Sequence, residues 1–176
     1  YCKKNQLNYI NWNTNKQIIK YPNTLKKLVF GQSFKQKLTN LPKNLTHLTT
    51  SITLLTINLT LSITHLTILY DRYTREIVNI PNSIIHLSFM GCVNKLLKYK
   101  LSNSITHLAF NNNCYCNSIM DNLPNSTKYL KLGLKFNQEI NKLPKSLEYL
   151  WFEMKFNNKI NLYEKIAILE KNDEVL

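Results

Sequence analysis

The feature that most constrains the fold is an internal repeat of about 20 residues that runs through most of the chain. Two clear copies are the segments LPNSTKYLKL at 123–132 and LPKSLEYLWF at 143–152. The central apolar residue of each copy recurs at intervals of 18 to 22 residues. These residues are Ile10, Leu28, Leu48, Leu66, Leu87, Leu108, Leu130 and Leu150. One copy cannot bury its apolar face alone, so the repeat predicts a solenoid of about eight stacked coils.

Each copy has the pattern of a short β-strand that follows a turn. Proline fixes its own backbone and lacks an N–H donor, so the Leu-Pro pair marks the turn into the strand. In the pattern L-x-x-L-x-F, the last two apolar residues lie two positions apart and share one face of a strand. We therefore expect Leu28 and Phe30 to point into the coil. A second apolar pair, such as Phe136 with Ile140, is expected to fill the opposite wall.

The consensus L-P-x-S-I/L-x-x-L-x-F-G-x-x-F-N-Q-x-I resembles the FNIP repeat, a relative of the leucine-rich repeat. The Leu-Pro openings and the segment FNQEI at 136–140 carry the resemblance best, and it extends from about Leu7 to Ile160. It implies a β-rich, leucine-rich-repeat-like solenoid of parallel strands that binds other proteins. Family members are abundant in social amoebae and giant viruses. Many viral members resemble ubiquitin-ligase substrate receptors, in which an F-box precedes the repeats.

Three copies depart from the family pattern. Those centred on Leu48 and Leu66 lack the Phe-Asn element, and the copy centred on Leu108 has Cys114-Tyr115-Cys116-Asn117 in its place. No F-box pattern occurs in the chain, so the adaptor role depends on an upstream segment. The chain begins at Tyr1 rather than Met, which leaves room for such a segment.

The chain is expected to form one solenoid domain over residues 1–176, with repeats at about 7–160 and a C-terminal cap at 161–176. Residues Asn161 to Lys171 have the pattern of a short helix, because Glu164 lies three positions after the N-cap residue Asn161. A terminal coil needs a cap, so we expect this helix to cover the end of the stack; whether it also covers Trp151 is left open by the sequence.

The residues on either side of each central apolar residue are expected to face outward. All four histidines of the protein occupy the preceding position, in four consecutive copies. Aromatic residues follow them at the C-terminal end, where exposed Tyr and Trp are typical of binding hot spots. The candidate partner-binding face is Lys27, His47, His65, His86, His107, Tyr129, Lys131, Tyr149 and Trp151.

The histidine column has three interpretations. Duplication of the repeat accounts for it as a tolerated surface ladder. A pH-sensitive surface is the second, because closely spaced imidazoles disfavour one another's protonation and lower their pKa values. Metal binding is the third, but a flat ladder supplies adjacent pairs rather than the tetrahedral set that zinc prefers. We assign no metal or cofactor to the chain.

The charge is strongly positive and unevenly distributed. The formal net charge is +13, and no Asp or Glu precedes Asp71, whereas nine Lys do. A basic half suggests acidic partners, including nucleic acid. However, nearly all of the charge is Lys, and an AT-rich genome favours Asn, Ile and Lys codons. Arg, the usual reader of base edges, occurs only at Arg72 and Arg75.

Neither catalysis nor membrane insertion is indicated. The chain has no Gly-rich phosphate loop, H-E-x-x-H motif or nucleophile elbow, so we expect no enzyme. Cys2, Cys92, Cys114 and Cys116 are too few for a disulfide framework and lack paired zinc-ligand spacing. The apolar stretch 52–70 alternates with polar residues, as a strand does. We expect a cytoplasmic location, which is the host cytoplasm if the protein is viral.

The predicted function is a protein-interaction module on the exposed face of the solenoid. The family resemblance implies that this module is the substrate-recognition part of an F-box adaptor. A basic nucleic-acid-binding surface and a structural spacer without a ligand remain as alternatives. Salt dependence separates the first two, because phosphate-driven binding weakens steeply with salt.

Overall fold

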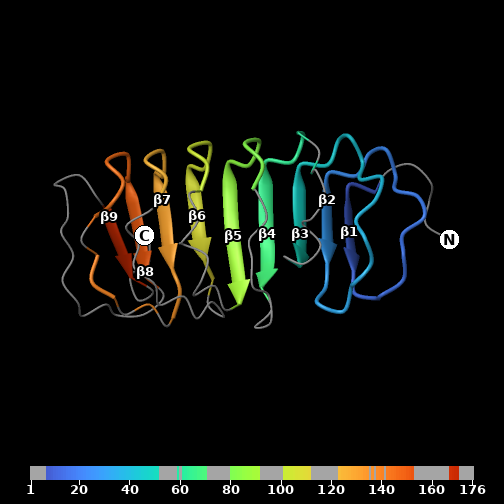
Figure 1. Cartoon of the computed structure of the whole chain (residues 1–176), viewed down its shortest axis with the longest axis horizontal. Coiled ribbons are helices and arrows are strands. Elements are labelled where there is room, and N and C mark those ends of the chain that lie inside the picture. The colour runs from blue at the N-terminus through green and yellow to red at the C-terminus, as the bar shows by residue number, and fades with distance from the viewer. Residues whose placement is uncertain are drawn as a thin grey trace.

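The computed structural model describes residues 7–51, 59, 61–70, 80–91, 101–111, 123–134, 136, 138–140, 142–152 and 167–170. Over these residues the chain forms a single sheet of nine parallel strands in sequence order (Figure 1). The strands are β1 (Tyr9–Trp12), β2 (Lys27–Phe30), β3 (His47–Ser51), β4 (His65–Tyr70), β5 (His86–Gly91), β6 (His107–Phe110), β7 (Tyr129–Leu132), β8 (Tyr149–Phe152) and β9 (Ala167–Glu170). The fold is therefore a parallel β-solenoid.

The register of the sheet follows the repeat. Each central apolar residue pairs with the central residue of the next strand, from Ile10 opposite Leu28 to Leu130 opposite Leu150. A parallel sheet keeps this alignment because a slip of one residue would move every apolar side chain to the solvent face. Parts of several return segments lie outside the described residues, so the structure describes the strands of the predicted coils more fully than the complete coils.

The C-terminal segment differs from the prediction. The predicted helix over 161–171 is wrong for Ala167–Glu170, which form β9 and pair in parallel with β8. Its remaining residues lie outside the described part. Pairing with β8 satisfies the hydrogen-bonding groups at the open edge of the sheet, which a helix packed across the end cannot do strand by strand. Hydrogen bonding to the open edge of β8 therefore determines the secondary structure of Ala167–Glu170 more strongly than the capping-box pattern does.

Apolar side chains form columns inside the solenoid, one residue per coil. The central leucines from Leu28 to Leu150 are at most 1% exposed, and the residues two positions later form a second buried column that includes Phe30, Phe89 and Phe110. Phe136 and Ile140 are buried on the opposite wall, as predicted. The core is thus continuous along the stack, and each coil contributes only a thin layer to it.

The proline that opens five of the copies begins a tight turn, and the chain after this turn is hydrogen-bonded to the neighbouring coil. The amide of Leu25 donates to the carbonyl of Pro22 at 3.1 Å, and the same turn recurs after Pro42, Pro81, Pro124 and Pro144. The serine of the motif then reaches the previous coil. Ser126 Oγ donates to the carbonyl of Ile105 at 2.8 Å, and Ser104 Oγ donates to that of Ile84 at 2.9 Å. These bonds favour Ser at this position of the motif, although Ser83 Oγ, at the same position after Pro81, is buried without a partner among the described residues.

One buried position breaks the apolar column that begins each strand. Thr127 is fully buried where other copies have Leu or Ile, and its Oγ1 has no hydrogen-bond partner among the described residues. A buried hydroxyl without a partner costs about 1–3 kcal/mol. We therefore expect Thr127→Val, which keeps the shape, to raise the free energy of unfolding by about 1 kcal/mol in urea denaturation. Thr127→Ser should lower it, and equal stability of all three proteins would contradict the assignment.

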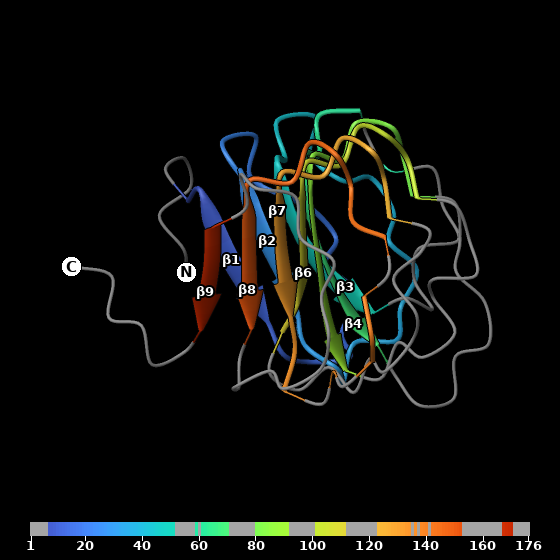
Figure 2. The same cartoon turned by 90° about the vertical axis from the view of Figure 1, so that its left-hand side faces the viewer.

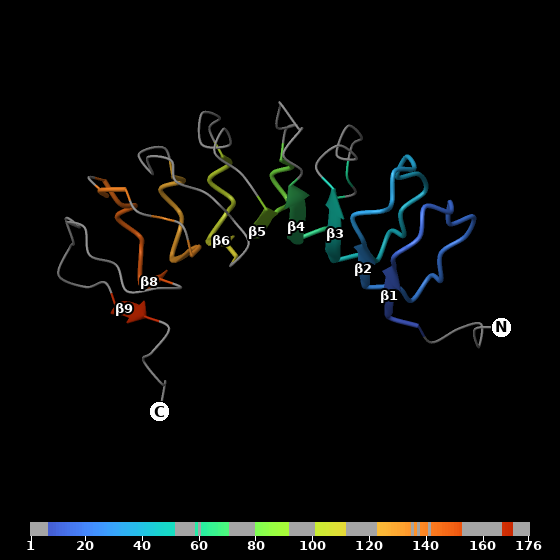
Figure 3. The same ribbon diagram turned by 90° about the horizontal axis from the view of Figure 1, so that it is seen from below.

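The sheet is curved along the stack. The strands line the inner side of an arc, and the described return segments lie on its outer side (Figures 2 and 3). β1 and β9 lie at opposite ends of the arc (Figure 1). Side chains that point away from the core therefore project from the sheet into the concave side of the molecule.

Candidate functional site

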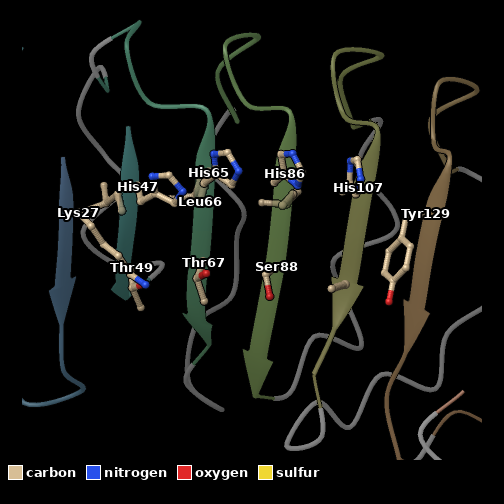
Figure 4. A pocket seen from close by; sticks show the side chains of 13 residues that line it. Lys27, His47, Thr49, His65, Leu66, Thr67, His86, Ser88, His107 and Tyr129 are labelled. Carbon is tan, nitrogen blue, oxygen red and sulfur yellow. The ribbon is translucent and has the colours of Figure 1, made fainter. Parts of the chain in front are cut away.

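The concave face contains a shallow, open groove across β2 to β7, with a volume of about 310 Å³. Two rows of side chains form its floor (Figure 4). The first row is Lys27, His47, His65, His86, His107 and Tyr129, and the second includes Thr49, Thr67, Ser88 and Ala109. The period-two alternation of a strand places both rows outward, because the Leu between them points inward. We call these residues the concave groove.

Four imidazole rings are stacked face to face along the groove. The ring centroids of His47 and His65, His65 and His86, and His86 and His107 are 4.0, 4.1 and 4.0 Å apart. The interplanar angles are 18°, 8° and 23°. Tyr129 continues the stack at 5.9 Å from His107. We call the four histidines the imidazole column; its order follows directly from the strand spacing.

Three of the four imidazole rings are each held in place by the threonine that precedes the histidine. Thr46 Oγ1 lies 2.8 Å from Nδ1 of His47, and the same hydroxyl donates to the carbonyl of Lys26 at 3.2 Å. The contact with this hydroxyl occupies Nδ1 and orients the His47 ring, so Nε2 is the nitrogen that has no part in it. The same contact is 2.9 Å in the pairs Thr64–His65 and Thr106–His107. His86 follows Ile85, so its neighbour supplies no hydroxyl.

The pKa values of three column histidines, His47, His65 and His86, are lowered, which favours their neutral form. Burial in the stack, followed by the positive potential of His47, His86 and His107, lowers the pKa of His65 to about 4. Burial also lowers the pKa of His47, with a smaller contribution from the charge of Lys27. Burial lowers the pKa of His86 as well, with smaller contributions from His107 and His47. Mutual repulsion acts in the direction expected from the sequence. Desolvation is the larger cause because each ring covers the faces of its neighbours.

The two ends of the groove are different. At the N-terminal end, Lys27 Nζ lies 5.5 Å from the ring centroid of Tyr9. At the other end lies a group of four residues, the aromatic end: Tyr129, Lys131, Tyr149 and Trp151. Tyr129 and Tyr149 are 6.3 Å apart, and Lys131 Nζ lies 5.8 Å from the Trp151 ring. Both cations are held against rings by cation–π attraction.

The structure places all nine candidate residues on one face, but not all of them in the groove. Lys27, the imidazole column and Tyr129 line it, whereas Lys131, Tyr149 and Trp151 continue the face beyond it. Tyr149 is 46% exposed, but Trp151 is half-buried and its Nε1 is buried without a partner among the described residues. Tyr149 is therefore the more accessible contact of the aromatic end.

The sequence prediction missed the hydroxyl residues of the site. Thr49, Thr67 and Ser88 form the second row of the groove, and Thr46 orients a column ring. The strand alternation was the available signal, since residues two positions apart share a face. It was applied to the residues next to each Leu, but only the bulky and ionisable ones were chosen as candidates.

Other predicted features have no described counterpart. Cys2, Cys92, Cys114 and Cys116 lie outside the described residues. Within the described ranges, no three His, Cys, Asp or Glu side chains are grouped as a metal site. A helix able to cross a membrane is also absent from the described part of the chain.

Comparison with known proteins agrees with the geometry. The FNIP Repeat family model matches residues 11–50, 94–135 and 117–155, which together are more than half of the chain. A similar solved structure is the giant-virus protein CroV588, whose crystal structure is described as a novel circular leucine-rich-repeat protein. The two chains are 34% identical with a TM-score of 0.61, over 85% of this chain and 24% of CroV588. This chain thus spans about a quarter of the length of that protein, and no curated protein matches it.

Leucine-rich-repeat-like solenoids typically act as non-catalytic scaffolds for protein interaction. The repeat register, the parallel sheet and the family match converge on the same assignment. The chain belongs to the FNIP-repeat family and folds as a leucine-rich-repeat-like β-solenoid.

Proposed function

We propose that the chain is a protein-interaction module that binds its partner in the concave groove. The observation that carries this proposal is the groove itself, where one continuous sheet presents a stacked row of imidazole and aromatic rings to solvent. Stacked rings are pre-organised, so they lose little side-chain entropy when a partner packs on them. Rigid aromatic side chains are also enriched among binding hot spots.

The finer role that we propose is substrate recognition within an F-box-type ubiquitin-ligase adaptor. The family resemblance supports it, because many viral FNIP proteins have this organisation. In this role the chain acts in the cytoplasm, or in the host cytoplasm if it is viral. The groove captures the substrate, and a segment beyond the chain recruits the ligase.

Nucleic-acid binding is the second candidate, and one observation favours it. Seven Lys and no acidic residue occur in residues 7–51. Among the described residues that line the groove, however, Lys27 is the only Lys and none is Arg. Single-stranded nucleic-acid sites usually follow the backbone with a row of cations, which this groove lacks. The basic surface therefore fits a steering role better than a phosphate-binding one.

Partner capture with groove variants tests the proposal. Thr67→Trp places a bulky, uncharged side chain in the second row of the groove, whereas Lys35→Ala changes an exposed residue outside it. We expect a host protein that is captured by the wild-type chain to bind the purified chain directly, at least tenfold more weakly to Thr67→Trp and equally to Lys35→Ala. Equal binding to all three chains by calorimetry would locate the interface elsewhere. Tighter binding of a single-stranded oligonucleotide than of the captured protein, with an affinity that falls steeply as salt is added, would favour nucleic acid.

A further inference from the structure

The concave groove has basic and titratable groups but no acidic group among its described lining residues. Lys27 projects from β2 at one end, and the imidazole column occupies β3 to β6. The described acid nearest in sequence to the aromatic end, Glu148, is paired with Lys128 at 2.9 Å and does not line the groove. A negatively charged partner therefore meets no like charge along the described floor.

The column nitrogens are arranged to donate to an acceptor when the rings are protonated. Nδ1 of His47, His65 and His107 lies within 2.9 Å of a threonine hydroxyl, so this nitrogen already has its partner. An imidazolium has two N–H groups, which leaves Nε2–H for a ligand. Hydrogen bonds between such cations and carboxylates are about twice as strong as neutral ones.

The dimensions of the groove suit a short extended peptide. From Lys27 on β2 to Tyr129 on β7 the sheet extends for about 24 Å, given a strand spacing of about 4.8 Å. An extended chain covers this distance with about seven residues, at roughly 3.4 Å per residue. The groove is open along this length, so a segment can lie across the strands without threading through a closed site.

We propose that the groove binds an acidic, extended segment of a partner protein, whose carboxylates lie over the imidazole column and against the Lys27 ammonium. This inference rests on the proposed function and specifies the chemistry of the partner. Charge complementarity supports it, because the whole chain carries a net charge of +13 and residues 7–51 contain no acid. The same charge accelerates the encounter with an acidic segment at low salt.

Binding of such a segment is coupled to proton uptake. In the free protein His65 is neutral at pH 7, because burial and its column neighbours lower its pKa to about 4. The groups that face the column are Lys27 from β2 and Tyr129 from β7, and neither supplies negative charge at neutral pH. A bound carboxylate favours the imidazolium and raises its pKa. Affinity must then increase as the pH falls below 7, until the free column also becomes protonated.

The test uses the full chain and a fluorescein-labelled ten-residue peptide of alternating Asp and Ala. A peptide with Asn in place of Asp is the matched control, and fluorescence anisotropy gives the affinity at pH 7.5 and 5.5. We expect the Asp peptide to bind about tenfold more tightly at the lower pH, since one proton taken up contributes at most tenfold per pH unit. The Asn peptide should bind at least tenfold more weakly than the Asp peptide at pH 5.5.

Variants assign the effect to the groove. Lys27→Ala should weaken binding of the Asp peptide at least threefold at both pH values, whereas Lys35→Ala should not. The double variant His65→Gln, His86→Gln should lose most of the pH dependence. Lys27 is exposed, so its variant stays informative even if the double variant fails to fold.

Three results would overturn the inference. They are equal binding of the Asp and Asn peptides, an affinity that does not change with pH, and stronger binding of a ten-nucleotide thymidine oligomer than of the Asp peptide at both pH values. The proposed function fails separately. A partner that is lost on Thr67→Trp but has no acidic segment refutes only this inference, whereas a partner insensitive to Thr67→Trp refutes the groove as the interface.

Discussion

Replacing Phe89 with Ala is expected to lower the free energy of unfolding by about 3–5 kcal/mol. Phe89 is fully buried on β5, and its ring lies 5.5 Å from that of Phe110 in the next coil, nearly parallel at 17°. On the other side it pairs in register with Ile68. The variant removes a large side chain from the continuous core and leaves a cavity between two coils, which rigid strands cannot close.

Met90→Ala is the matched control for this prediction. Met90 follows Phe89 on the same strand but points outward and is 38% exposed. Its truncation should change stability by no more than about 0.5 kcal/mol. Urea denaturation followed by circular dichroism measures both variants. Similar losses for the two variants would mean that the core is not organised by the observed strand alternation.

Acidification is expected to destabilise the free protein through the imidazole column. In an unfolded chain a histidine has a pKa near 6.5, whereas in the folded protein that of His65 is lowered to about 4. Between these values the unfolded chain binds a proton that the folded chain does not. The stability is therefore full above about pH 6.5 and is lost as the pH falls towards 4. With a discount for solvent screening at half-exposed rings, we expect a loss of about 2 kcal/mol.

The double variant His65→Gln, His86→Gln isolates this contribution. It removes two column members and leaves the carboxylates, including the Lys128–Glu148 pair, unchanged. The free energy of unfolding is measured for wild type and variant at pH 7.5 and 4.5. The difference between the two proteins in the stability lost over this pH range is the contribution of the two histidines. We expect the wild type to lose more stability than the variant. A larger loss in the variant would show that protonation of the column stabilises the fold.

The strand register was accessible from the sequence because the repeat is its own alignment. Aligning the central apolar residues predicted which residues lie side by side, and Leu66 does pair with Leu87, as His65 does with His86. The same alignment predicted that the four histidines share one column. These predictions succeed because a solenoid uses local periodicity, so sequence spacing maps directly onto spatial spacing.

The C-terminal segment shows where local pattern was insufficient. Residues 167–170 lie in a stretch with helix-capping residues, yet they form a strand against β8. Intrinsic preferences are small per residue and are overridden when tertiary pairing supplies hydrogen bonds to an open edge. No sequence window contains that edge, because it exists only once the preceding coil has folded.

The sequence by itself therefore determined the repeat, the parallel strands and the identity of the column residues, since all of these depend on spacing along the chain. Only the tertiary structure decided that the column faces a concave side, that its rings stack at 4.0–4.1 Å and that three threonines orient them. It also decided that Trp151 is half-buried. The physical reason is that curvature, ring contact and desolvation arise between coils, where the packing of neighbouring strands and not the order of residues sets the distances.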